Sequence, residues 1–528
     1  MNDTHYDWII VGSGFGGSVA ALRLAEKGYR VLVIEKGLRF APKDFAKNNQ
    51  DLKRWYWLPK LGFKGIFQMS FFDHMTVVHG VGVGGGSLTY ACTLPTPAGP
   101  FFSSPSWSDL ANWKAELAPH YETALRMLGA TENPSDVPAD RILKEVAKEM
   151  GRESHFAKTR VSIYFGEPGE TVPDPYFDGE GPDRVGCTEC GACMTGCRVG
   201  AKNTLDMNYL YLAEKRDCTI LPETEVLAVR QRDGGGYLVE TKCSTEDRDH
   251  RTLTADRVVL AGGVLGTVPL LLKMKEQADG LPSLSDHLGD FVRTNSESLI
   301  NVTAEGDDVD YARGIAISSI LHTDEHSHLE PVRYGAGSNF FQPMLLPHAP
   351  GDRVLTRVVR SIATIAKSPK RFWAVRRAKD MSRQSTILLY MRSLEGTLKL
   401  RLGRSPLTGF RKSLVTRLDE GTPAPRAFIE EATELAWRFA EKMKGLPQTL
   451  FTETLIGTPT TAHILGGCCM GESAATGVID HRHQVHGYEG LYVIDGSSMS
   501  ANPGVNPSLT ITALAERAMT FIPPKLPA

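Results

Sequence analysis

The sequence lacks several features that mark whole classes of protein. It has no uninterrupted run of about 18 apolar residues and no basic, apolar leader before its first apolar segment, so we expect neither a membrane span nor secretion. It has little net charge, with 59 Lys and Arg against 61 Asp and Glu, which excludes a general affinity for nucleic acid. Cysteine is scarce, at nine in 528 residues, which argues against a disulfide framework. We therefore expect a cytoplasmic protein.

The length of 528 residues exceeds what a single hydrophobic core usually serves. It allows about three domains, or two large ones built from interleaved segments. We find no internal repeat and no low-complexity tract.

A strand, a glycine turn and a helix are predicted near the amino terminus. The first apolar run leads into Gly-Ser-Gly-Phe-Gly-Gly at 12–17, then into an Ala/Leu-rich segment and a second apolar run that ends in Glu35. In such a unit Gly12 permits the tight turn, Gly14 lets backbone N–H groups approach a pyrophosphate, and Gly17 lets the helix pack on the strand. Glu35 can accept hydrogen bonds from a ribose. The segment therefore predicts a dinucleotide site.

Two further segments help to distinguish a flavin from a nicotinamide. The stretch 80–90 is too rich in glycine for a strand; it suits close approach of the backbone to a flat or anionic group, or it is an irregular loop. Towards the carboxyl end, His463 opens the string HILGGC, a predicted strand ends in Asp495, and Asn506-Pro507 opens a predicted helix.

These strings resemble the glucose–methanol–choline (GMC) oxidoreductase family, and within it the cholesterol oxidase branch. HILGGC, LYVIDGS, VNPSLTITALAER and the segment 258–263 carry the resemblance, which covers both ends of the chain and its middle. It implies FAD as the cofactor and an α/β fold, in which a Rossmann-like FAD-binding domain is interleaved with an α+β substrate domain that contains a large antiparallel sheet. We expect residues 1–45, 76–112, 184–300 and 455–528 in the FAD-binding domain, and residues 46–75, 113–183 and 301–454 in the substrate-binding domain.

The resemblance also assigns the residues that would hold FAD. They lie in the two glycine-rich loops, after the apolar runs and in the carboxyl-terminal motifs: Gly12, Gly14, Phe15, Gly16, Gly17, Glu35, Lys36, Gly82, Gly84, Gly85, Gly86, Ser87, Val226, Ala261, Gly262, Asp495, Gly496, Asn506, Pro507 and Ser508.

An alcohol-oxidising flavoenzyme needs a base or hydrogen-bond acceptor beside the reactive nitrogen of the flavin. His463 stands at the position of the family's active-site histidine, and Asn506 matches the asparagine that completes the pair. The plainer interpretations are a structural histidine and an asparagine that caps the helix before Pro507; capping is compatible with a catalytic role. The resemblance thus implies His463 as the base and Asn506 as its polar partner.

Two positions depart from the cholesterol oxidase branch. Ser508 stands where the branch carries an aromatic residue that gates a channel, which puts such gating in doubt. On a loose alignment, Gln384 replaces a glutamate that moves a steroid double bond, and an amide cannot shuttle a proton as a carboxylate does. We therefore predict oxidation without isomerisation.

A cluster of cysteines has the C-x2-C-x2-C-x3-C spacing that wraps a cubane cluster in bacterial ferredoxins: Cys187, Cys190, Cys193 and Cys197. Arg198 replaces the proline that usually follows. Two interpretations stay open. One is a 4Fe-4S or 3Fe-4S cluster that passes electrons from the flavin to a carrier; the other is a reduced or zinc-bound knot that only shapes a loop.

A basic amphipathic stretch covers residues 353–383, where ten Lys and Arg stand against one acid, Asp380, with apolar residues interleaved. Such a stretch suits peripheral contact with an anionic bilayer, from which a water-insoluble sterol would enter the protein. A plain pair of surface helices on the substrate domain fits the same pattern.

Together these features predict an FAD-dependent oxidoreductase that converts a secondary hydroxyl of a large apolar substrate to the ketone. The first candidate is the 3β-hydroxyl of cholesterol or a related sterol, with dioxygen or an electron carrier as the acceptor. The alternatives are a dehydrogenase of long-chain or terpenoid alcohols with a non-oxygen acceptor, and a flavin- or sterol-binding protein without turnover.

Overall fold

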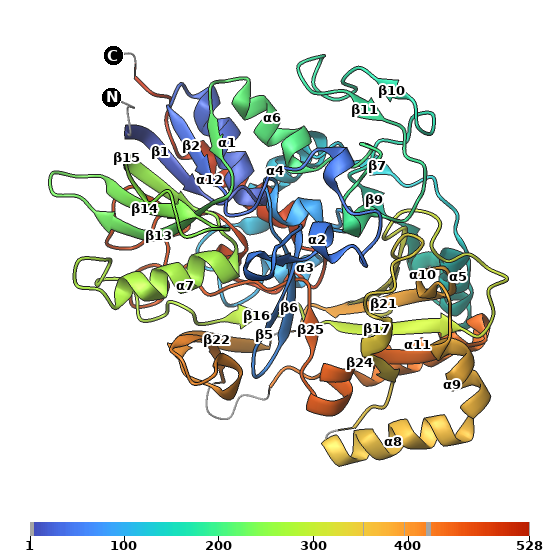
Figure 1. The fold of residues 1–528 in the computed structure, drawn as a ribbon. Coiled ribbons are helices and arrows are strands. Elements are labelled where there is room, and N and C mark those ends of the chain that lie inside the picture. The colour runs from blue at the N-terminus through green and yellow to red at the C-terminus, as the bar shows by residue number, and fades with distance from the viewer. Residues whose placement is uncertain (1–4, 352, 395, 419–423, 527–528) are drawn as a thin grey trace.

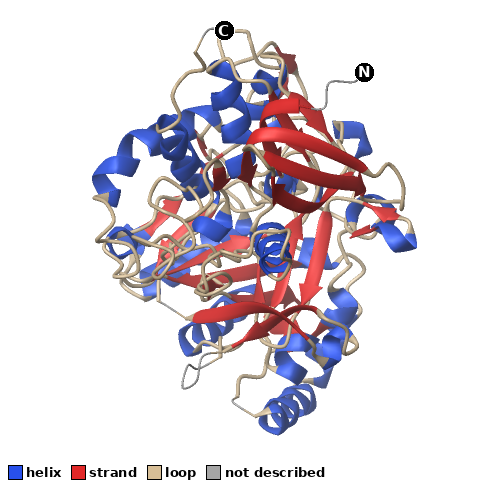
Figure 2. Cartoon of the chain, turned by 90° about the vertical axis from the view of Figure 1, so that its left-hand side faces the viewer, coloured by secondary structure: helices blue, strands red, loops and turns tan. Residues whose placement is uncertain are grey.

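Two sheets of seven strands organise the chain, and the computed structural model describes them within residues 5–351, 353–394, 396–418 and 424–526. The first sheet lies at the end of the molecule that holds both termini, and the second lies at the other end (Figure 1). Close to the chain ends, Lys525 Nζ donates to Asp7 Oδ2 at 2.6 Å. Figure 2 shows strands in both the upper and the lower half of the molecule, with helices around them.

The first sheet is Rossmann-like. Its strands are β1 (His5–Val11), β2 (Val31–Ile34), β12 (Thr219–Leu221), β13 (Thr224–Gln231), β14 (Tyr237–Cys243), β15 (Arg251–Leu260) and β26 (Leu491–Val493). The order β12-β2-β1-β15-β26 is parallel. The first half of β15 also pairs with the antiparallel strand β14, which pairs in turn with β13. β1 lies in the middle of the parallel part of the sheet. Its apolar run is buried there, as expected for a parallel strand covered by helices.

Helices pack around this sheet. α1 (Phe15–Glu26) contacts α12 (Ser508–Thr520) and α6 (Tyr209–Glu214), and α12 contacts α4 (Trp113–Met127). α7 (Val264–Lys275) follows β15 as α1 follows β1. One continuous apolar core joins these helices to the sheet.

The second sheet is antiparallel, in the order β20-β24-β17-β21-β19-β18-β8. Its strands are β8 (Phe156–Lys158), β17 (Ser298–Ala304), β18 (Ser319–His322), β19 (Ser327–Val332), β20 (Leu345–Pro347), β21 (Ser385–Arg392) and β24 (Gly445–Leu450). α5 (Pro138–Glu149) and α11 (Glu430–Met443) turn apolar stripes to it and form a second core with β17, β19 and β21.

Smaller elements complete the described chain. Two three-stranded sheets consist of β5 (Phe67–Phe71), β6 (Thr76–Gly80) and β25 (Thr460–Thr461), and of β16 (Val292–Arg293), β22 (Thr397–Gly403) and β23 (Ser413–Arg417). The remaining α-helices are α2 (Leu52–Trp55), α3 (Gly99–Phe102), α8 (Val354–Lys367), α9 (Pro369–Arg376) and α10 (Met381–Gln384). Short strand pairs join β3 (Trp57–Leu58) with β4 (Phe63–Lys64), β7 (Thr131–Glu132) with β9 (Arg160–Val161), and β10 (Thr171–Val172) with β11 (Arg184–Val185).

The predicted fold class is confirmed, since a Rossmann-like sheet and a large antiparallel sheet are both present and are built from interleaved segments. The domain boundaries stay a prediction. Helix α4, which the predicted division gives to the substrate domain, packs on α12 of the Rossmann-like half. No helix among the described residues combines the length and the hydropathy that a bilayer crossing requires.

Candidate active site

A cavity of about 600 Å³ is lined by residues of both sheets. Part of its wall is formed by the turns that follow β1, β2 and β15, and another part by side chains of β17, β21 and β24. The carboxyl ends of parallel strands are where ligands bind in open α/β sheets. The cavity therefore joins a dinucleotide-binding edge to a second, antiparallel wall.

The turn between β1 and α1 brings a helix amino terminus to this cavity. The first bond within α1 runs from Ser18 N to Gly14 O at 2.9 Å, so the preceding N–H groups have no partner inside the helix and suit a pyrophosphate. A Cβ on Gly14 would meet no atom within 4 Å, whereas a Cβ on Gly17 would lie 2.1 Å from the carbonyl oxygen of Gly12. Gly14 thus leaves room for a ligand, and Gly17 allows the helix to approach the strand.

The Glu35 carboxylate lies beside this turn, just after β2. Its Oε2 accepts hydrogen bonds from Ser13 N at 3.1 Å and from Ser13 Oγ at 2.7 Å, and its Oε1 accepts one from Gly37 N at 2.9 Å. Ser13 Oγ also accepts a hydrogen bond from Gly84 N at 3.1 Å. Ser13 therefore links the acidic residue to the second glycine loop. Sequence reasoning missed it, and its place inside the glycine turn was the available signal.

The second glycine run forms a loop that touches the first. A Cβ on Gly85 would lie 2.6 Å from Gly14 Cα. Gly82 and Gly84 have φ angles of 135° and 104°, which favour glycine. Ser87 supports the loop, because its Oγ donates to Gly84 O at 2.7 Å.

Asp495 brings the carboxyl-terminal segment to the same place. Its carboxylate accepts hydrogen bonds from Gly263 N at 2.8 Å, Thr267 Oγ1 at 2.6 Å and Ser497 N at 2.7 Å. Burial raises the pKa of Asp495. These bonds tie the segment after β26 to the start of α7, so the carboxylate itself is engaged by the protein.

Most of the predicted cofactor residues line the cavity: Gly12, Gly14, Phe15, Gly16, Glu35, Lys36, Gly85, Gly86, Val226, Ala261, Gly262, Asp495, Gly496, Asn506, Pro507 and Ser508. Gly17, Gly82, Gly84 and Ser87 lie behind this wall and hold its loops in place.

The residues present fit FAD. The helix amino terminus and the open space at Gly14 suit a pyrophosphate, and Glu35 suits a ribose. The buried Ser508 Oγ lies in the cavity wall and has no hydrogen-bond partner among the described residues, so it can bond a ligand.

His463 lines the cavity with a carboxylate directly behind it. The Nδ1 atom of His463 contacts Glu297 Oε1, and Glu297 Oε2 accepts a hydrogen bond from Ala462 N at 3.0 Å. The Glu297 side chain is fully buried. A carboxylate at Nδ1 fixes the ring orientation and stabilises the imidazolium that forms when Nε2 takes a proton.

Asn506 also lines the cavity and has a second buried carboxyl group, that of Glu330, beside it. In the amide orientation that satisfies both groups, the Asn506 nitrogen donates to Glu330 Oε1 at 3.1 Å and to Oε2 at 3.2 Å. Burial, together with the nearby charge of Glu297, raises the pKa of Glu330 to about 8. Neither glutamate was found by sequence reasoning, because no local motif marks them.

The second wall of the cavity is largely apolar, with side chains from several strands and from α10: Leu299, Ile317, Val332, Phe341, Leu345, Met381, Ile387, Leu389 and Leu450. Gln384 is not among the lining residues, and its Nε2 donates to Gly306 O at 2.9 Å. Gln384 thus lies outside the described cavity wall, and its replacement of the isomerising glutamate stays a prediction.

The cysteine motif lines a separate cavity of about 20 Å³, which is room for little more than one water molecule. Its four thiols are free. Within the described part of the chain, no three His, Cys, Asp or Glu side chains are placed to hold one metal ion. The structure thus gives no support to the predicted iron–sulfur cluster or to a zinc site.

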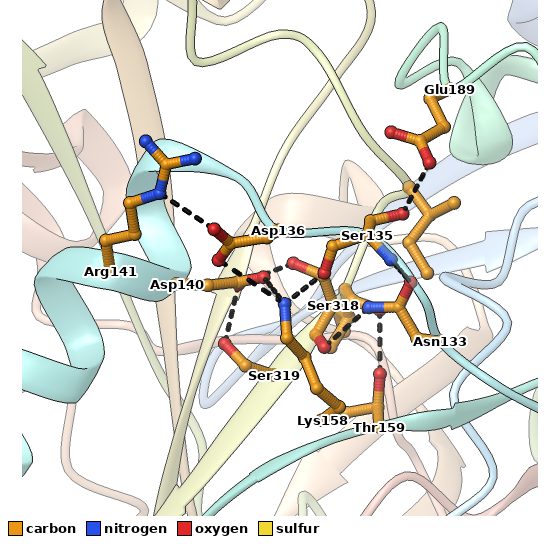
Figure 3. A network of polar contacts seen from close by, with 12 residues as sticks. Asn133, Ser135, Asp136, Asp140, Arg141, Lys158, Thr159, Glu189, Ser318 and Ser319 are labelled. Atoms are coloured by element: carbon orange, nitrogen blue, oxygen red, sulfur yellow. Dashed lines mark hydrogen bonds and ion pairs between the residues drawn. The ribbon is translucent and has the colours of Figure 1, made fainter.

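Polar contacts anchor the cysteine segment on both sides. Lys202 Nζ donates to Cys193 O at 2.8 Å and to Leu88 O at 3.0 Å, next to the glycine loop. On the other side, Glu189 Oε1 accepts a hydrogen bond from Ser135 Oγ at 3.0 Å (Figure 3). Through Lys202, the cysteine segment is therefore linked to the backbone beside the second glycine loop.

Ser135 belongs to a buried network around Asp140 (Figure 3). Asp140 Oδ1 accepts hydrogen bonds from Ser318 Oγ at 2.6 Å and Ser319 Oγ at 2.7 Å, and Lys158 Nζ donates to Oδ2 at 3.0 Å. Lys158 Nζ also donates to the Ser135 carbonyl. The network joins α5, β8 and β18 to the cysteine segment.

Comparison with known families and proteins gives matches along the whole chain. Residues 181–274 and 416–515 match models described as GMC oxidoreductase, and residues 10–43 match an NAD(P)-binding Rossmann-like domain. A cholesterol oxidase from Acinetobacter baumannii is 44% identical, over 99% of this chain and 96% of that protein. A cholesterol oxidase from Mycobacterium tuberculosis is also 44% identical, over 98% of this chain and 91% of that protein.

Solved structures show the same fold. Pyridoxine 4-oxidase from Mesorbium loti superposes with a TM-score of 0.61 at 15% identity, over 98% of each chain. Since both family models lie on the segments that build the cavity, and two relatives match at 44% identity over nearly the whole chain, the protein belongs to the GMC oxidoreductase family.

Proposed function

We propose that this protein oxidises the 3β-hydroxyl of cholesterol or a related sterol to the ketone, with FAD as its cofactor. The observation that carries the proposal is one cavity in which His463 and Asn506 lie between dinucleotide-binding loops and a large apolar wall. The apolar wall suits a fused-ring lipid with a single polar end. The two relatives named cholesterol oxidase support the same substrate class.

His463 acts as the base in this proposal. Its Nε2 atom takes the hydroxyl proton of the substrate, while the contact between Nδ1 and Glu297 holds the ring and balances the charge that develops. FAD, held by the glycine loops and Glu35, would supply the acceptor for the hydride of the carbinol carbon. Proton and hydride together account for the conversion of a secondary alcohol to a ketone.

Asn506 is the polar partner. Its amide is held by Glu330, so its position in the cavity wall is fixed before substrate arrives. A fixed amide can hold the substrate oxygen or the flavin edge at low entropic cost.

We also propose that the cofactor residues predicted from the sequence contact FAD in two ways: those in the cavity wall directly, and Gly17, Gly82, Gly84 and Ser87 through the loops they support. The interleaved domain division predicted from the sequence is proposed with this assignment.

Dioxygen is the proposed electron acceptor. The alternative, a dehydrogenase that passes electrons through an iron–sulfur cluster, would need a metal at the cysteine motif, where the cavity is about 20 Å³. Elemental iron analysis of the purified protein separates the two, and an iron content that scales with flavin would favour the alternative.

Oxidation without isomerisation stays part of the proposal. The carboxylates in the cavity wall are Glu35, Glu225 and Asp495, and all three lie with the dinucleotide motifs. A 5-ene sterol should therefore yield an unconjugated ketone first, whereas direct formation of the conjugated 4-ene ketone would contradict this part.

The test of the proposed function is product analysis with the FAD-loaded enzyme in air. Cholesterol, a long-chain primary alcohol and a terpenoid alcohol are each offered, and ketone or aldehyde formation is followed together with peroxide release. We expect the sterol ketone and an equal amount of peroxide from cholesterol. Turnover of the long-chain alcohol without turnover of cholesterol would overturn the substrate assignment.

A further inference from the structure

Helix α8 buries polar side chains and exposes apolar ones, the opposite of an ordinary surface helix. Its buried residues are Arg357 and Ser361, while the side chains on the opposite face are apolar and exposed. Leu355, Val359 and Ile362, spaced i, i+4 and i+7, are 74%, 56% and 60% exposed. The helix forms an outer edge of the molecule, at the end away from the chain termini (Figure 1).

Buried polar contacts fix this orientation. Arg357 Nε donates to Thr454 O at 2.8 Å, and Arg357 Nη1 donates to Gly351 O at 2.8 Å. Rotating the helix to hide Leu355 and Ile362 would break both bonds and leave polar groups unsatisfied. The apolar stripe therefore stays turned outward.

Apolar residues next to α8 extend the exposed surface. Leu455 and Ile456, in the helical turn that α8 contacts, are exposed, and so is Trp373 of the neighbouring α9. An exposed apolar patch of this kind marks a contact surface.

The basic charge of this surface indicates which partner it contacts. Residues 353–383 hold ten Lys and Arg and one acid, Asp380. Arg357 is buried, Arg371 pairs with Glu305 and Arg383 pairs with Asp380, which leaves seven other basic side chains. A second copy of this chain would bring two such basic segments together, which like-charge repulsion disfavours. An anionic lipid surface offers the opposite charge and an apolar layer for the stripe.

We propose that α8 and α9 form a docking surface for an anionic lipid bilayer. Leu355, Val359 and Ile362 enter the boundary between headgroups and acyl chains, and exposed basic side chains, Arg360, Lys367 and Lys370 among them, contact anionic headgroups. Trp373 lies at the interface level, where an amphipathic ring is favoured.

Docking at α8 and α9 would bring a membrane sterol close to the cavity; this link between docking and catalysis rests on the proposed function. α8 packs on β20 and α9 packs on β24, and both strands contribute lining residues to the cavity, Leu345 and Leu450 among them. A bilayer held against α8 and α9 would lie beside the apolar wall, so a membrane-resident sterol need not pass through bulk water.

The experiment is vesicle flotation of the FAD-loaded full chain. Sterol-free vesicles of phosphatidylcholine alone are compared with vesicles of equal parts phosphatidylcholine and phosphatidylglycerol. We expect binding to the mixed vesicles, reduced by added salt, and weak binding to phosphatidylcholine. In the double variant Leu355→Ser/Ile362→Ser, affinity for mixed vesicles should fall about tenfold, since two apolar side chains no longer leave water.

A matched control replaces two equally exposed leucines outside the surface, Leu407 and Leu526, by serine; they are 58% and 85% exposed. This control should bind vesicles like the wild type. Both double variants should oxidise detergent-dispersed cholesterol at the wild-type rate, and only Leu355→Ser/Ile362→Ser should be slow on sterol inside vesicles.

Three results would overturn the docking surface: no binding to mixed vesicles, equal losses in both double variants, or a wild-type dimer in solution that Leu355→Ser/Ile362→Ser dissociates. Because the binding assay contains no sterol, it reports docking even if the proposed function is wrong. Normal docking without cholesterol turnover would contradict the function alone.

Discussion

A buried carboxylate behind a histidine decides which ring nitrogen meets the substrate. Glu297 contacts Nδ1 of His463 and also holds the backbone of Ala462, so it sets both the tautomer and the position of the ring. Glu297 is thus a positioning residue in the proposed reaction, and its effect can be measured apart from that of His463.

Replacing Glu297 by glutamine keeps the shape but removes the charge. We expect kcat to fall about a hundredfold, because the imidazolium formed on proton transfer loses its counter-charge. Steady-state kinetics over a range of pH measure this, and the pH profile should change shape along with the rate. Glu453→Gln is the control: Glu453 is buried but lies outside the cavity wall, and this variant should keep the wild-type rate.

Glu330 should make the free energy of unfolding depend on pH. Its pKa is raised from an ordinary 4.5 to about 8 by burial, so the folded state holds the proton more tightly than the unfolded state. The free energy of unfolding should therefore fall as pH rises from about 4.5 to about 8. Glu330→Gln removes this contribution and should gain a few kcal/mol relative to the wild type by pH 8, at about 1.4 kcal/mol per pKa unit.

Denaturant titrations at several pH values give the comparison. The matched control is Glu325→Gln, which changes an exposed glutamate of the same half and should follow the wild-type curve. Parallel curves for wild type and Glu330→Gln would contradict a proton held at Glu330.

Among the elements, the turn between β1 and α1 holds one glycine whose replacement should affect ligand binding and another whose replacement should affect folding. Gly14→Ala puts a methyl group into open space, so the stability of the FAD-free protein should stay within about 0.5 kcal/mol. The same methyl group occupies the place offered to the pyrophosphate, so FAD affinity should fall about a hundredfold. Gly17→Ala places a Cβ 2.1 Å from the Gly12 oxygen and should destabilise the FAD-free protein itself.

Thermal unfolding without FAD, together with FAD titration by fluorescence, resolves the two effects. If Gly14→Ala lost stability as Gly17→Ala does, the space at Gly14 would not be a ligand site.

The network around Asp140 ties α5 and β18 to the cysteine segment. Asp140→Ala would leave Lys158 and two serines without their shared acceptor, which should cost about 3 kcal/mol or more of stability. Its exposed neighbour Asp136 pairs with Arg141 at 2.9 Å and more distantly with Lys158 at 3.8 Å, so Asp136→Ala should cost less than about 1 kcal/mol (Figure 3). Chemical denaturation compares the two variants, and similar losses would contradict a structural role centred on Asp140.

At the scale of the whole molecule, the sequence was most informative where the signal is local. The turn at 12–17 and the acid after β2 lie within one βαβ unit, so their spacing predicts their geometry. His463 and Asn506 could be assigned only through a resemblance, since nothing local distinguishes them from structural residues.

Other features depend on contacts between distant segments. Glu297 is 166 residues from His463 in the chain, and neither neighbourhood predicts the pair. The amphipathic pattern of α8 was visible in the sequence, but a buried Arg357 decides which face turns outward. The cysteine spacing predicted a cluster as well as a knot, and only the packed structure shows how little room the four thiols enclose.

The proposed reaction requires two halves of the molecule to meet at one cavity, with FAD on one wall and a sterol against the other. The most direct test adds cholesterol to the FAD-loaded protein without oxygen and follows the flavin absorption in a stopped-flow spectrometer. We expect rapid bleaching in the wild type and bleaching slowed about a thousandfold in His463→Gln, which keeps its FAD. Equal rates in the two proteins, or no bleaching of the wild type by any sterol, would contradict the proposed reaction.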